Sequence, residues 1–331
     1  MRVVVLSVTI LVLITANPAA PAPHRMGNII GWISWAPGPT ILFEADNLYS
    51  VRGDGTGLRM LPLLLHPVWA PGGTRIAGDV GDPPGSIFVM NADGTGFHRV
   101  RVGGMYPMWS PSGDRIAATT GYRILVMNAD GRSVRKVAAL RFGQDPRREL
   151  DWSPDGSRVV FSQCLRSVPD GDFCQGRRAG IFTVSADRQL GPKRKVLSGT
   201  DCPDWAPASR IAVGSRGAIR TVEPNGSRPR VAIAQPFNCG SWSPDGRLVA
   251  AETYSGLVLA KADGSARWRL HKLPPGDVEI EGPPAPVWSP DGKWIAVSRM
   301  VQNSAEKISS RLYVIRVSDG RARLIVRTPY R

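Results

Sequence analysis

Residues 288–297 read Trp-Ser-Pro-Asp-Gly-Lys-Trp-Ile-Ala-Val, and their first three positions set the pattern of the whole chain. A tryptophan followed by Ala or Ser and then by proline occurs seven times, with spacings of 34, 40, 43, 53, 37 and 46 residues. A repeat near 40 residues with turn residues at fixed places is typical of a β-propeller, in which each repeat builds one four-stranded blade. The seven motif tryptophans are Trp35, Trp69, Trp109, Trp152, Trp205, Trp242 and Trp288.

The number of copies sets the number of blades. Residues 28–327 divide into seven repeats of about 43 residues, whereas six blades would need about 50 residues each and would leave one copy unexplained. We therefore predict an all-β fold, a seven-bladed β-propeller of four-stranded antiparallel blades in one domain over 28–327, with six blades as the fallback. The motif tryptophans are expected to fill the gaps between neighbouring blades, because a large apolar ring suits that place.

The third repeat shows the expected strands most clearly. Strands are predicted at 105–109, 115–119, 123–127 and 133–139, separated by Ser-Pro-Ser-Gly and Asn-Ala-Asp-Gly turns. Because no strand is left after Arg327, we expect blades 7 and 1 to close the ring by packing face to face rather than by exchanging a strand.

Two stretches carry a resemblance to a known family. Trp-Ser-Pro-Asp-Gly with Ile-Ala-Val (288–292 and 295–297) and Ile-Phe-Val-Met-Asn-Ala-Asp-Gly (87–94) resemble the TolB-type propeller repeat. That repeat is a relative in architecture of the WD-repeat propellers. The resemblance covers 28–327 and implies the propeller fold. TolB itself carries an α/β domain ahead of its propeller, which is not expected here, so its partnership with an envelope lipoprotein is not carried over.

The N-terminus predicts export. One positive charge, a 14-residue apolar stretch at 3–16 and small residues after it are typical of a signal peptide, placed at 1–22. We expect an extracellular or periplasmic protein with no membrane span after cleavage. Four cysteines fit two disulfides, Cys164–Cys174 and Cys202–Cys239. The second pair should join blades 5 and 6, since each cysteine lies three residues before its motif tryptophan.

The chain is strongly basic, with 42 Lys and Arg against 27 Asp and Glu and a formal charge of +15. A basic surface attracts anionic partners, but a solvated, arginine-rich surface explains the same composition. The basic residues are scattered and show no interleaving with aromatic residues, so specific nucleic-acid binding is not expected. No paired cysteine spacing favours a metal site, and no cofactor is expected.

Sequence differences between the repeats point to one face. The long connections at 163–179 and 301–310, and those at 141–150 and 272–286, all fall on the face opposite the short Asp-Gly turns. The residues three places before the motif tryptophans should ring the channel mouth on that face. Candidate binding residues there are Trp32, His66, Tyr106 and Glu149, with Asp151 and Asp204 close by. Solvation of a water-filled channel is the alternative role for this polar arc.

No catalytic motif is present: the chain lacks a Gly-x-Ser-x-Gly elbow, a His-Glu-x-x-His pair and a Gly-x4-Gly-Lys loop. A carboxylate pair such as Glu149 with Asp204 could serve a lyase or glycosidase, although nothing singles it out. We therefore expect an exported, monomeric, non-catalytic binding or scaffolding propeller that acts through its long-loop face on an unknown protein or cell-envelope polymer. The alternative is an extracytoplasmic propeller lyase or hydrolase acting on polysaccharide or peptide.

Overall fold

The computed structural model of the 331-residue chain describes residues 29–81, 85–120, 122–140, 150–164, 179–198, 201–207, 210–215, 217–234, 239–253, 256–272, 285–302 and 307–329. Several sequence predictions fall outside these residues: the signal peptide at 1–22, Glu149, Cys174 and most of the four long connections. In the described part of the chain, no helix is long and apolar enough to cross a membrane.

The described residues form seven four-stranded antiparallel sheets, each made of four strands that follow one another in the sequence. The prediction of seven blades is confirmed. Blades 1 to 3 comprise β1 (Ile33–Trp35), β2 (Thr40–Ala45), β3 (Asn47–Arg52), β4 (Arg59–Leu61), β5 (Leu65–Trp69), β6 (Arg75–Val80), β7 (Ser86–Asn91), β8 (His98–Val102), β9 (Met105–Trp109), β10 (Arg115–Thr119), β11 (Arg123–Asn128) and β12 (Arg135–Ala139).

The remaining four blades repeat the same order. They comprise β13 (Leu150–Trp152), β14 (Arg158–Cys164), β15 (Ala179–Ser185), β16 (Arg194–Ser198), β17 (Asp201–Trp205), β18 (Ile211–Ser215), β19 (Ala218–Val222), β20 (Arg230–Ala234), β21 (Ser241–Trp242), β22 (Leu248–Thr253), β23 (Gly256–Lys261), β24 (Arg267–His271), β25 (Val287–Trp288), β26 (Trp294–Gln302), β27 (Ile308–Arg316) and β28 (Ala322–Arg327).

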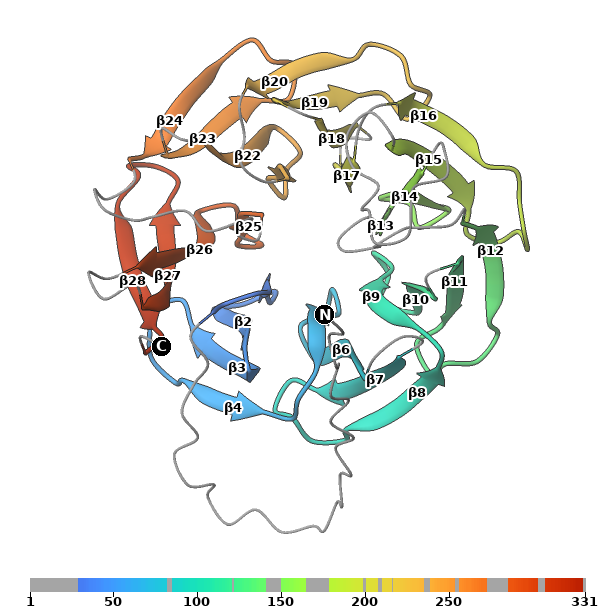
Figure 1. Ribbon diagram of the computed structural model, residues 1–331, viewed down its shortest axis with the longest axis horizontal. Helices are drawn as coiled ribbons and strands as arrows, with labels where there is room; N and C mark the ends of the chain where they lie inside the picture. Colours follow the sequence, from blue (N-terminus) through green and yellow to red (C-terminus); the bar gives the residue numbers. More distant parts are fainter. Residues whose placement is uncertain are drawn as a thin grey trace, which may run out of the picture.

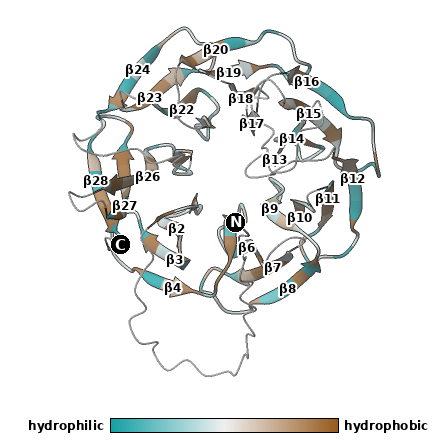
Figure 2. Cartoon of the chain, viewed as in Figure 1, coloured by the Kyte–Doolittle hydropathy of each residue, from teal (hydrophilic) through white to brown (hydrophobic). Residues whose placement is uncertain are grey.

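The seven sheets stand in a ring around a common axis (Figure 1). The first strand of each blade lies nearest the axis, and the fourth strands, among them β4, β8, β12 and β24, form the circumference. Hydropathy follows this order, because the outermost strands carry most of the hydrophilic colour and the middle strands most of the hydrophobic colour (Figure 2). The core therefore lies within and between the blades.

Three of the seven motif tryptophans bond to the blade before them through the indole N–H. The indole Nε1 of Trp152 donates to the carbonyl O of Met108 over 3.1 Å, in the blade before it. Trp288 makes the same 3.1 Å bond to the preceding blade, and Trp242 makes it over 3.0 Å. Trp152 is only 3% exposed, whereas Trp35 and Trp69 remain partly exposed.

The ring closes by face packing, as expected. Blade 1 and blade 7 share no sheet, but Ile33 and Phe43 of blade 1 belong to one apolar cluster with Leu312 and Val314 of blade 7. Two side-chain hydrogen bonds hold Ile30, just before β1: Ser310 Oγ accepts from its N–H over 3.0 Å, and Ser298 Oγ donates to its carbonyl O over 3.2 Å.

Candidate functional site

Three of the predicted mouth residues meet at the start of the innermost strands. Trp32 precedes β1, His66 lies in β5 and Tyr106 lies in β9. The ring centroids of Trp32 and His66 are 5.2 Å apart with an edge-on geometry. Those of His66 and Tyr106 are 4.1 Å apart. The side chains of three consecutive blades thus form one continuous aromatic row.

An irregular backbone positions this row. His66 and Tyr106 have φ of 50° and 52°, in the left-handed region that L-residues seldom occupy. In both strands the pairing register shifts at this point, so one extra residue forms a β-bulge. A left-handed conformation costs roughly 1–2 kcal/mol in a residue other than glycine, and such strain tends to occur at functional sites. The bulge turns the aromatic side chain away from its regular place in the strand.

Carboxylates of the preceding blade, Asp79 fully buried and Glu44 partly buried, hold the bulges. The carboxylate of Glu44, in β2, accepts the backbone N–H of His66 over 3.3 Å. Asp79, in β6, accepts the backbone N–H of Tyr106 over 3.0 Å. A backbone group displaced from a strand ladder needs another partner, and the carboxylates supply one across each gap between blades.

These carboxylates were not among the residues selected from the sequence, although the sequence carries a signal for them. Each repeat places a polar residue or glycine three positions after the first core residue of its second strand, where an aliphatic residue would otherwise continue the run. Ser298, which holds Ile30, occupies the same place in blade 7. The full set is Glu44, Asp79, Thr119, Ser162, Gly214, Glu252 and Ser298.

Asp79 also orients the His66 ring. Its Oδ1 lies 2.9 Å from Nδ1 of His66, and the Asp79 side chain is fully buried while that of His66 is 20% exposed. A carboxylate at Nδ1 makes that nitrogen the donor and leaves Nε2 as an acceptor. Asp79 Oδ2 is buried without a hydrogen-bond partner among the described residues. An oriented, partly exposed imidazole can act either as a hydrogen-bonding group or as a general base.

Asp151 and Asp204 lie together but are occupied by the backbone. Asp151 accepts the N–H groups of Trp152 and Trp205 over 2.8 and 2.6 Å, and Asp204 accepts that of Trp242 over 2.8 Å. Burial and the neighbouring Asp204 carboxylate raise the pKa of Asp151 well above its usual value. Burial raises the pKa of Asp204 to about 6. Two such carboxyl groups favour sharing a proton. Through their bonds to Trp205 and Trp242, Asp151 and Asp204 connect blade 4 to blade 5 and blade 5 to blade 6.

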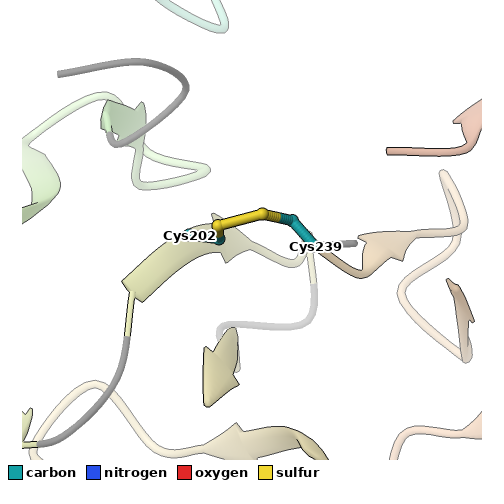
Figure 3. The surroundings of a disulfide bond; sticks show 2 residues. All are labelled: Cys202 and Cys239. Atoms are coloured by element: carbon teal, nitrogen blue, oxygen red, sulfur yellow. A yellow bond between two sulfur atoms is a disulfide. The ribbon is translucent and has the colours of Figure 1, made fainter. Parts of the chain in front are cut away.

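The structure contains the Cys202–Cys239 disulfide, with Cα atoms 5.7 Å apart (Figure 3). It joins β17 of blade 5 to Cys239, two residues before β21 of blade 6, as predicted. Cys202 has φ of 51° at a register shift, so it occupies the same bulged place as His66 and Tyr106. The predicted Cys164–Cys174 bridge and the role of Glu149 lie outside the described residues.

Within the described ranges, no group of three or more His, Cys, Asp and Glu side chains is placed to hold a metal ion. The hydrogen bonds of Glu44 and Asp79 hold the aromatic row in its place.

The sequence matches no protein-family model and no curated protein. Similarity to solved structures is extensive and confined to the fold. A puromycin-hydrolysing peptidase of Mycobacterium tuberculosis is 15% identical, with a TM-score of 0.67 over 93% of this chain and 56% of the peptidase. The chain thus spans about half the length of that enzyme. An oligogalacturonate lyase of Vibrio parahaemolyticus is 12% identical, with a TM-score of 0.62 over 90% of this chain and 86% of the lyase.

TolB propellers are also among the structural neighbours. TolB of Acinetobacter baumannii is 18% identical, with a TM-score of 0.49 over 74% of this chain and 64% of its own. A likeness of this degree carries no argument about function. The TolB-type resemblance of the repeats therefore remains a statement about sequence pattern.

Proposed function

We propose that this protein is an exported, monomeric propeller that binds an anionic cell-envelope polymer without catalysing a reaction. Binding takes place at the aromatic row of Trp32, His66 and Tyr106, on the face that carries the long connections. Export is supported by the apolar N-terminal segment and by the Cys202–Cys239 disulfide, since such bonds persist in oxidising compartments.

The observation that carries the proposal is the preformed aromatic row. Three rings from three blades lie in contact, and two of them sit at strained positions that carboxylates of the preceding blade hold in place. Such preorganisation lowers the ordering cost of binding. Flat rings suit the apolar faces of sugar units, while His66 and Tyr106 also offer polar atoms at the same place.

The charge distribution supports an anionic polymer. The seven outermost strands contain twelve Lys and Arg residues and no Asp or Glu. These charges also protect the exposed strand edges from pairing with other chains. A uniformly basic circumference raises the local concentration of a polyanion around the molecule, and the aromatic row then supplies the short-range contact.

Polygalacturonate, an anionic polysaccharide, and dextran, a neutral one, provide the test. We expect polygalacturonate to bind the mature protein and Tyr106→Ala to weaken that binding about tenfold, as expected for a loss near 1.4 kcal/mol. Trp268→Ala is the matched control, because Trp268 is an exposed aromatic residue on outermost strand β24. Equal binding by wild type and Tyr106→Ala would refute a role for the row.

An extracytoplasmic propeller enzyme is the second candidate, and the His66–Asp79 pair favours it. A buried carboxylate that orients an imidazole is the arrangement of a general base and its positioning group. Oligogalacturonate lyases share the fold. Lyase action on polygalacturonate would produce an unsaturated product measured by ultraviolet absorbance, and His66→Gln would abolish it. Binding without product formation supports the non-catalytic proposal.

A further inference from the structure

A cavity lies on the face opposite the aromatic row, where the ring closes. It has a volume of about 430 Å³ and is lined by Trp35, Pro39 and Asp54 of blade 1 and by Asp291, Trp294 and Arg323 of blade 7. Its walls come from the short turns that follow the first and third strands, away from the aromatic row. The volume falls within the range of small-ligand sites.

Two other seams, those between blades 2 and 3 and between blades 3 and 4, fill the equivalent place with an arginine. Arg75, the first residue of β6, stacks over Trp109 of the next blade at 4.7 Å and donates to the carbonyl O of Gly113 over 2.9 Å. Arg115, the first residue of β10, stacks over Trp152 at 5.1 Å and donates to Gly156 O over 2.6 Å. In both seams a guanidinium covers the motif tryptophan and bonds to its turn.

The closing seam lacks this arginine. Arg75 and Arg115 lie six residues after their own motif tryptophans, and the residue six places after Trp288 is Trp294. Trp35, the tryptophan that should be covered, turns its Nε1 to Gly38 O of its own turn over 3.1 Å. It therefore does not make the bond to the preceding blade that Trp152 makes, and in this it resembles Trp69, Trp109 and Trp205, whose Nε1 atoms have no partner among the described residues.

The seam is also wider than the others at the turn after the third strand. A Cβ added at Gly131 would lie far inside contact distance of Val100 O on the preceding blade, whereas a Cβ added at Gly55 of blade 1 would lie 3.8 Å from Ile325 O. The missing guanidinium and the wider spacing together explain why a cavity forms here.

The lining holds two carboxylates and the Arg323 guanidinium, and Asp291 already pairs with Lys293 Nζ over 3.5 Å, which leaves Asp54 as the carboxylate for a further cation. Hydrogen bonds from Thr56 lower the pKa of Asp54, and a hydrogen bond from Ser289 lowers that of Asp291. Both carboxylates are therefore ionised at neutral pH, beside the apolar surfaces of two indoles and two prolines. Arg323, exposed on β28, can donate to the carbonyl groups of a bound peptide.

We propose that this cavity binds an arginine side chain of a partner peptide, in the place that Arg75 and Arg115 take in the seams of the ring itself. The guanidinium stacks on the indole of Trp35 and donates to the turn carbonyls and the Asp54 carboxylate. A guanidinium fits better than an ammonium, because it is planar and presents its donors as a fork. The flanking Pro39 and Pro290 provide an apolar surface for the extended backbone of the peptide.

The first test uses the wild-type chain and three peptides: acetyl-Pro-Arg-Pro-amide and its lysine and citrulline counterparts. Indole N–H resonances labelled with nitrogen-15, assigned through Trp35→Phe and Trp294→Phe, report the site. We expect saturable shifts of the Trp35 and Trp294 resonances with the arginine peptide and at least about tenfold weaker binding of the uncharged citrulline peptide. Equal binding of the two peptides, or shifts confined to Trp32, would overturn the proposal.

A second test restores the repeat. Trp294→Arg is expected to fill the cavity with a guanidinium of the chain itself, reducing binding of the arginine peptide about tenfold or more while the Tm is kept. Trp268→Arg adds the same charge at an exposed tryptophan of outermost strand β24 and should bind as wild type does. Unchanged binding by Trp294→Arg would refute the site. Tyr106→Ala separates the two proposals, since it should weaken polygalacturonate binding and leave peptide binding intact.

Discussion

The seam between blades 2 and 3 and the closing seam between blades 7 and 1 are built from the same repeat but differ in how the motif tryptophan is covered. At the first seam Trp109 is 5% exposed and lies under the Arg75 guanidinium. At the second, Trp35 is partly exposed, Trp294 stands in the place of the arginine, and a cavity of about 430 Å³ opens. The seam between blades 2 and 3 thus covers its tryptophan with a guanidinium, whereas the closing seam leaves Trp35 beside an open cavity.

The difference shows that a residue of one blade determines the surroundings of a residue in the next blade. Each motif tryptophan needs its neighbouring blade to complete its surroundings, so the change at Trp294 acts on Trp35 of blade 1. The aromatic row follows the same rule, because Glu44 and Asp79 position residues of the blade after their own. Both proposed sites therefore lie between two blades rather than within a single repeat.

The largest effect is expected at the covalently tied seam between blades 5 and 6. Replacing Cys202 and Cys239 together by alanine should lower the free energy of unfolding by about 3–4 kcal/mol in the chain-entropy model, because the bond closes a separation of 37 residues. Urea unfolding with and without reductant measures it. The double variant should be insensitive to reductant, and a wild type that is equally insensitive would show that the bridge does not stabilise the native ring.

Two glycines compare the packed and open seams directly. Gly131 and Gly55 have φ of 82° and 89°, so alanine at either should cost roughly 1–2 kcal/mol for the left-handed conformation. Gly131→Ala should lose about 1–3 kcal/mol more, because its Cβ would overlap Val100 O across the seam between blades 2 and 3. Thermal unfolding of both variants checks this. Equal losses would mean that the closing seam is as tight as the others.

The sequence carries nearly all of the fold in this protein. Seven copies of the Trp-x-Pro motif and the Asp-Gly turns predict the blades, since turn chemistry and strand periodicity are local properties. The Cys202–Cys239 bridge also follows from the repeat, because equal places in consecutive blades lie side by side near the axis. Each of these inferences needs only the position of a residue within its own repeat.

The aromatic row and the cavity at Trp35 were harder to predict from the sequence. The predicted row of Trp32, His66 and Tyr106 came from the same positional argument, but Glu44 and Asp79 act across a seam. The cavity at Trp35 depends on the orientation of an indole and on the spacing of two blades, and neither is a local property. Asp151 and Asp204 were predicted as binding residues, and the structure engages both with backbone N–H groups.

The carboxyl pair makes another seam sensitive to pH. Asp204 has a folded pKa of about 6 against an ordinary value of 3.8, so the folded chain binds more protons between those values and its stability falls as pH rises through them. Asp204→Asn should make this slope shallower and gain on the order of 1–2 kcal/mol at neutral pH, while Asp151, whose pKa burial also raises, keeps part of the slope.

Urea unfolding from pH 4 to 7 measures the slope. Asp155→Asn is the control, because Ser153 lowers the pKa of Asp155 to about 2. The lowered pKa of Asp155 stabilises the folded chain above the unfolded pKa, and this stabilisation is lost as the pH falls toward 2. Asp155→Asn should therefore keep the wild-type slope from pH 4 to 7 and differ from wild type in slope only below pH 4. An unchanged slope in Asp204→Asn between pH 4 and 6 would contradict the shared-proton account.

The smallest expected effect comes from uncovering the motif tryptophan at the packed seam between blades 2 and 3. Arg75→Ala removes the guanidinium over Trp109 and its hydrogen bond to Gly113 O. We expect a loss of about 1 kcal/mol in the free energy of unfolding, since cation–π contacts at partly exposed sites contribute about 0.5–1 kcal/mol.

The variant should also gain a second, weaker site for acetyl-Pro-Arg-Pro-amide, seen as a shift of the Trp109 indole resonance. The seam between blades 2 and 3 is more closely packed than the closing seam, so the new site should bind less tightly than the one at Trp35. If the Trp109 indole resonance does not shift with the peptide, an exposed motif tryptophan and a turn carbonyl are insufficient to bind an arginine side chain. The carboxylate of Asp54 would then carry the recognition at the closing seam.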